Sequence, residues 1–263
     1  ELDNGLTVGI SFVLDQGDNA DGAAGSAESP FDSHSVSISS DALGKLVMHG
    51  EGGSNAQAAI DTTAAGDIWD TFDDANQAVG TKVNSSVSGA DILVYTLPSM
   101  VDGLSASASY SPQESGHSSS TAWAATYTGV EGLSVSYGIG NQDESSAAEG
   151  DTTTLSASYA YGPVTVGYSN NDHQTETADE DQETTSYKVS YTVSDAISVT
   201  YGEEAVDEQG ATTDAEYTKM SASYTSGGMT ITATSAEMKN GAFDATSKAD
   251  DQDYWSLGLS FAF

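Results

Sequence analysis

The last eleven residues, 253–263, read Asp-Tyr-Trp-Ser-Leu-Gly-Leu-Ser-Phe-Ala-Phe. In an extended strand, successive side chains point to opposite faces. One face of this stretch is therefore wholly apolar and consists of Trp255, Leu257, Leu259, Phe261 and Phe263. The opposite face carries Tyr254 and small residues. This pattern predicts a β-strand with one apolar face and one face of small or polar side chains.

The same alternation recurs along most of the chain. In residues 104–110, 187–192 and 229–234, apolar side chains alternate with serine, threonine or lysine. Such a face of small hydroxyls does not form a packed core, but it can line water. We count about fourteen strands, in which short turns alternate with long, acid-rich connections such as residues 172–183. The longest irregular stretch covers about residues 51–89.

Composition excludes several classes of protein. The chain has 6 Lys+Arg, all of them lysine, against 40 Asp+Glu, for a formal net charge of -34. Such a charge repels nucleic acid, which we exclude as a partner. Cysteine is absent, so disulfide and thiolate chemistry are excluded. No run of about 18 apolar residues predicts a transmembrane helix.

Together these patterns predict an all-β protein, a transmembrane antiparallel up-and-down β-barrel, formed by a single domain over residues 1–263. In lipid only helices and closed barrels satisfy the backbone, and short turns at one rim with long loops at the other are typical of outer-membrane barrels. Aromatic residues at the strand ends predict a girdle at the membrane interfaces. The expected girdle consists of Tyr110, Tyr127, Tyr137, Tyr159, Tyr168, Tyr224, Trp255 and Phe263.

Three stretches resemble a known family. The terminal strand with its final Phe263 is similar to the last strand of bacterial outer-membrane barrels, which the assembly machinery recognises. Residues 44–74, with Gly66-Asp67-Ile68-Trp69-Asp70 near their end, resemble a strand and the constriction loop of Gram-negative general porins of the alphaproteobacterial trimeric type. Residues 91–97 resemble the strand that follows this loop.

The resemblance implies a 16-stranded barrel with a long loop folded inward after the fifth strand. Here the loop follows the third predicted strand, so we expect two further strands before Glu1, or else a natural barrel of fourteen strands. It also implies an outer-membrane location, a homotrimer, and contact with the bilayer and lipopolysaccharide. The implied activity is passive diffusion of small hydrophilic solutes through a water-filled channel.

In the family that the sequence resembles, loop acids face a basic cluster across the pore. Carried over to this chain, the constriction consists of Glu51, Asp61, Asp67, Asp70, Asp73, Asp74, Lys188 and Lys219. The basic side departs from the pattern because arginine is absent. An unbalanced acidic constriction concentrates cations and repels anions. The expected channel is therefore cation-selective, unless these acids only solvate the loop.

Other chemistry finds little support in the sequence. The four histidines lack metal-ligand spacing, and no local motif indicates a catalytic nucleophile with its base. We expect no enzyme activity and no cofactor, with weak Ca²⁺ binding at the acidic loops or simple solvation of their charges. Two alternatives stay open: a narrower, substrate-specific barrel channel, and a soluble or surface β protein from a high-salt environment.

Overall fold

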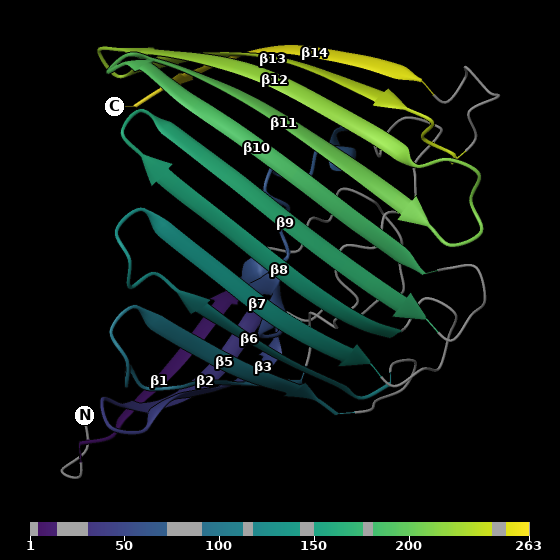
Figure 1. Cartoon of the computed structure of the whole chain (residues 1–263). Coiled ribbons are helices and arrows are strands. Elements are labelled where there is room, and N and C mark those ends of the chain that lie inside the picture. The colour runs from purple at the N-terminus through teal and green to yellow at the C-terminus, as the bar shows by residue number, and fades with distance from the viewer. Residues whose placement is uncertain are drawn as a thin grey trace, which may run out of the picture.

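The computed structural model describes residues 5–14, 31–72, 91–112, 118–142, 150–175, 181–243 and 251–262. Its strands form one antiparallel sheet of 14 strands, ordered along the sheet as they are along the chain. The sheet curves into the wall of a barrel (Figure 1). The predicted all-β, up-and-down fold is confirmed. β1 and β14 are the edge strands, and the described residues record no pairing between them.

The strands lie close to the predicted stretches. Their bounds are β1 Thr7–Leu14, β2 Phe31–Ser40, β3 Gly44–Glu51, β4 Ile92–Thr96, β5 Leu104–Ser111, β6 Ser120–Tyr127, β7 Leu133–Gln142, β8 Gly150–Tyr161, β9 Val164–Thr175, β10 Gln182–Ser194, β11 Ile197–Glu208, β12 Ala215–Ser226, β13 Met229–Lys239 and β14 Gln252–Phe261. Two short 3₁₀ helices, η2 Gln57–Ile60 and η3 Trp69–Phe72, lie between β3 and β4. No helix in the described part of the chain is long and apolar enough to cross a membrane.

Short turns gather at one rim of the barrel. The connections β2–β3, β4–β5, β6–β7, β8–β9, β10–β11 and β12–β13 lie together there, and β1 begins and β14 ends at the same rim (Figure 1). Gly103 in one of these turns has a φ of 75°, and a Cβ there would lie 2.3 Å from the backbone nitrogen of Gly129. Only glycine fits this conformation and this close approach without strain.

The two faces of the sheet differ as the alternation predicts. Large apolar side chains point outward and stay exposed, with Ile10 at 75% and Trp255 at 79%. The inward face carries hydroxyls, several of which hydrogen-bond across neighbouring strands, as between Ser190 and Thr200 at 2.9 Å. The wall thus has an apolar outside and a polar inside.

The predicted long loop over residues 172–183 is wrong in its bounds. β9 continues to Thr175 and β10 begins at Gln182, so much of the acidic stretch is strand. β11 likewise continues through the acidic residues Glu203, Glu204 and Asp207 to Glu208. Strands that extend past the apolar band meet water on the outside, so polar residues there do not interrupt pairing. Polarity marks the edge of the apolar band rather than the strand end.

Candidate functional site

The described part of the predicted constriction loop lies inside the barrel (Figure 1). We call residues 52–72 the inner segment. Its helix η2 contacts β6, β7 and β8, and side chains of residues 65–72 pack against β11, β12 and β13. The inner segment therefore runs along the wall across several neighbouring strands.

Backbone amides of the inner segment donate to serine hydroxyls of the wall. The N–H of Ala56 donates to Ser109 Oγ of β5 at 2.9 Å. Those of Ala64 and Ala65 donate to Ser169 Oγ of β9 at 2.8 Å and to Ser186 Oγ of β10 at 2.9 Å. These small inward side chains let the segment approach the wall and satisfy its buried amides.

Gln57 fixes the first turn of the inner segment. Its side chain is fully buried, and its Nε2 donates to Thr154 Oγ1 at 2.9 Å and to the backbone oxygen of Thr152 at 3.3 Å. Thr154 Oγ1 in turn donates to Asn171 Oδ1 at 2.8 Å. The Asn55 side chain accepts the N–H groups of Gln57 and Ala58 and so shapes the turn itself.

A carboxylate of β11 holds the second helix of the inner segment. Glu204 is 2% exposed, and its Oε2 accepts the N–H groups of Ile68 at 2.7 Å and Trp69 at 3.3 Å. Its Oε1 accepts the hydroxyl of Thr63. Amides at the start of a helix have no partner inside it, so Glu204 satisfies donors at the start of η3.

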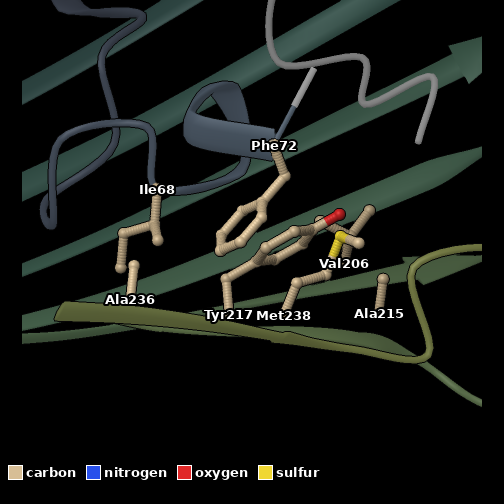
Figure 2. Close-up of a cluster of buried hydrophobic side chains, with 7 residues drawn as sticks. All are labelled: Ile68, Phe72, Val206, Ala215, Tyr217, Ala236 and Met238. Atoms are coloured by element: carbon tan, nitrogen blue, oxygen red, sulfur yellow. The ribbon is translucent and has the colours of Figure 1, made fainter. Parts of the chain in front are cut away.

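An apolar cluster lies beside this contact. Ile68 and Phe72 of the inner segment pack against Val206, Ala215, Tyr217, Ala236 and Met238 of β11, β12 and β13 (Figure 2). The rings of Phe72 and Tyr217 lie 6.0 Å apart. The inward face of these strand ends is therefore apolar, and the interpretation of the whole inward face as hydroxyls and charges is wrong at this place.

The predicted acids occupy different positions. Asp61 and Asp67 are half-buried and Asp70 is exposed, all three on the inner segment, whereas Asp73 and Asp74 lie outside the described residues. Glu51 is the last residue of β3, and its Oε2 lies 3.9 Å from His34 Nδ1. The structure thus brings three of the predicted acids together on one segment.

Asp67 has the most constrained environment of these three acids. Its Oδ1 accepts the N–H of Thr63 at 2.9 Å, and its own N–H donates to Thr63 Oγ1 at 2.7 Å. Burial raises the pKa of its carboxyl above the usual value, and the charges of Asp61 and Asp70 add to the rise while the Thr63 hydrogen bonds oppose it. Asp67 therefore accepts a proton more readily than an ordinary aspartate.

The two predicted lysines lie on the stretch of wall that the inner segment covers. One row across the strands reads Gly167, Lys188, Gly202, Lys219, Ala236. Cβ atoms at Gly167 and Gly202 would lie 3.4 Å from Ala64 Cβ and 2.7 Å from Ala65 Cβ. Lys188 and Lys219 thus lie beside the two glycines that contact the segment, and their role opposite the acids stays a prediction.

The predicted aromatic residues that the structure describes point outward. Tyr110, Tyr127, Tyr137, Tyr159, Tyr224 and Trp255 are exposed, and Phe263 lies outside the described residues. Tyr168 is half-buried because its ring packs against Tyr187, with centroids 5.3 Å apart. Trp123, Tyr187 and Tyr191 share this outward surface and were not in the predicted set. Their role as a membrane girdle stays a prediction.

Sequence reasoning missed Glu204, Gln57 and the apolar cluster. A signal for the cluster exists, because the alternation inverts at the strand ends: Tyr217 and Met238 point inward, whereas Glu216 and Glu237 point outward. Nothing in the sequence marks Glu204 apart from its neighbour Glu203, because its role depends on the path of a distant segment. The described residues contain no group of three or more acids or histidines placed to hold a metal ion.

The chain matches known porins. The sequence profile of the Gram-negative porin family matches residues 1–210. A triple mutant of the Rh. blastica porin superposes with a TM-score of 0.62 at 16% identity, over 100% of this chain and 86% of that one. A porin refined at 1.8 Å gives 0.59 at 20% identity, over 88% and 81%.

A further likeness comes from another genus. The trimer form of OmpT, an outer-membrane protein of Vibrio cholerae, superposes with a TM-score of 0.52 at 15% identity, over 89% of this chain and 80% of that one. No curated protein matches the sequence. The family profile covers well over half of the chain, and the barrel wall and inward-folded segment agree with it. The chain therefore belongs to the Gram-negative porin family and is an outer-membrane β-barrel channel protein.

Proposed function

We propose that the protein is a non-enzymatic pore through which small hydrophilic solutes diffuse passively, with a preference for cations. The observation that supports this proposal is the inner segment, which lies inside the barrel and carries Asp61, Asp67 and Asp70 in its sequence. Lys188 and Lys219 are the lysines on the wall that this segment covers. A surplus of negative charge in a confined, low-dielectric channel attracts cations.

Liposome swelling tests the diffusion pore. Vesicles that contain the purified protein are placed in iso-osmotic solutions of neutral sugars of increasing size. The proposal predicts swelling rates that fall smoothly with solute size, because the width of the pore alone limits the diffusion of a neutral sugar. Fast swelling with one sugar and none with smaller ones would instead indicate a substrate-specific channel.

We further propose a homotrimer that associates through the outward faces of β1, β2 and β3. In the described residues these faces carry exposed aliphatic side chains and Phe12 but no tyrosine or tryptophan. The outward faces of β5 to β12, by contrast, carry tyrosines or tryptophan on most strands. Aromatic residues with a polar tip suit a lipid interface, so a wall without them fits a protein contact better.

Contacts with lipopolysaccharide and weak Ca²⁺ binding stay predictions. The outward carboxylates Asp172, Glu183 and Asp207 are direct neighbours across β9, β10 and β11. Like charges in such positions repel each other, and diffuse divalent cations would relieve this repulsion. A melting temperature of the purified protein that does not change between Ca²⁺ and chelator would count against this prediction.

A further inference from the structure

Strand β11 presents two inward positions, Gly202 and Glu204, to the inner segment. We propose that this pair sets the distance of the segment from the wall and thereby the width and steadiness of the open pore. Glu204 is a positioning residue in this proposal, because it acts through the segment that it holds. The inference rests on the proposed diffusion pore, since the position of the segment affects transport only in an open channel.

Glu204 holds the segment through both carboxylate oxygens. Oε2 accepts the amides of Ile68 and Trp69, and Oε1 accepts the hydroxyls of Thr63 and, at 3.5 Å, Ser186. Ser186 Oγ also accepts the N–H of Ala65 at 2.9 Å. Glu204 therefore accepts hydrogen bonds from three residues of the inner segment, Thr63, Ile68 and Trp69, and contacts the hydroxyl that holds Ala65. An amide in its place would remove the negative charge and one of the two acceptor oxygens, and its NH₂ group would find acceptors only if the hydroxyls of Thr63 and Ser186 turned.

Gly202 limits how closely the segment can approach the wall. A Cβ at this position would lie 2.7 Å from Ala65 Cβ and 3.5 Å from Ile68 Cδ1. Two Cβ atoms do not approach each other as closely as 2.7 Å, so either the wall or the inner segment must move. The wall is fixed there by ladder hydrogen bonds to β10 and β12. A methyl group at position 202 therefore moves the inner segment toward the lumen.

Single-channel recording separates the effect of Gly202 on the width of the pore from the effect of Glu204 on its steadiness. Gly202→Ala is expected to lower the conductance of the open level, because the displaced segment narrows the pore. Glu204→Gln is expected to raise the frequency of closures at least about ten-fold, the factor that corresponds to losing a hydrogen bond to a charged group. The matched control is Glu203→Gln, because Glu203 points outward and accepts the hydroxyl of Tyr201 instead.

A cross-link gives a readout that does not depend on transport. The sequence has no cysteine, and Ala64 Cβ lies 3.4 Å from a Cβ built at Gly167, close to the separation in disulfides. The pair Ala64→Cys with Gly167→Cys is expected to oxidise quickly alone or with Glu203→Gln, and more slowly with Glu204→Gln. Once formed, the disulfide should suppress the extra closures of Glu204→Gln, and reductant should restore them.

Equal cross-linking rates in the Glu204→Gln and Glu203→Gln backgrounds, with unchanged conductance in Gly202→Ala, would overturn the inference. If the unaltered protein shows no conductance at all, the proposed diffusion pore fails instead. The cross-linking rates measured in detergent then decide alone whether Glu204 holds the segment.

Discussion

At Asp67 a single threonine binds both the backbone and the side chain. Thr63 donates its N–H to the carboxylate and accepts the N–H of Asp67, which fixes a backbone φ of 47°. Aspartate tolerates this left-handed conformation better than most residues do. The carboxylate is thus held at a defined place on the inner segment, and burial raises its pKa.

The raised pKa of Asp67 predicts how selectivity depends on pH. As the pH falls, Asp67 binds a proton before an ordinary aspartate would, so part of the cation preference is lost early. Asp67→Asn should remove this early step and leave the remainder of the titration in place. Reversal potentials measured between pH 7 and pH 3 follow this loss of cation preference. An identical pH dependence in Asp67→Asn and in the unaltered protein would show that the early step does not come from Asp67.

At the scale of the elements, the ends of β11, β12 and β13 carry apolar side chains inward, where the inner segment covers them. Tyr217 is 1% exposed and packs on Phe72. Tyr217→Ala should lower the free energy of unfolding by at least about 3 kcal/mol, because it leaves a large cavity. Tyr187→Ala is the control, because Tyr187 lies on the outward face and is 53% exposed. It should lower the free energy of unfolding clearly less. Unfolding in detergent measures both, and equal losses would argue against the packing.

The sequence predicted the elements better than it predicted their contacts. Turns such as that at Gly103 and the alternation of faces follow from local chemistry, so strand order and direction were predictable. Strand ends such as Thr175 were not, because polar residues continue a strand once it leaves the apolar band. The role of Glu204 and the position of Lys188 beside the inner segment depend on how this distant segment runs along the wall. Local sequence patterns do not encode that path.

The outward surface of the protein is uneven around the barrel. The wall from β1 to β3 is aliphatic, and Ile10 is 75% exposed. β1 and β14 stand at the two edges of the described sheet, and lipid does not satisfy the backbone groups of an open edge. The expectation of sixteen strands in all stays a prediction.

The aliphatic wall predicts where the trimer can be broken. Ile10→Lys should dissociate it into monomers, because a lysine ammonium buried in an apolar contact has no partner. Val189→Lys, on the outward face of β10 and 49% exposed, is the matched control and should leave the trimer intact. Unheated gel electrophoresis and light scattering in detergent measure the assembly. Monomers from both variants, or from neither, would count against this interface.

In the function that we propose, the acids of the inner segment make an open pore prefer cations. Planar-bilayer recording under a salt gradient measures this preference, with the unaltered protein beside the triple variant Asp61→Asn, Asp67→Asn and Asp70→Asn. We predict stable conductance steps in both proteins, a cation-selective reversal potential in the unaltered one, and a potential much closer to zero in the variant. Equal reversal potentials in the two proteins would show that these acids do not set the selectivity, and no steps from the unaltered protein would show that it forms no open pore.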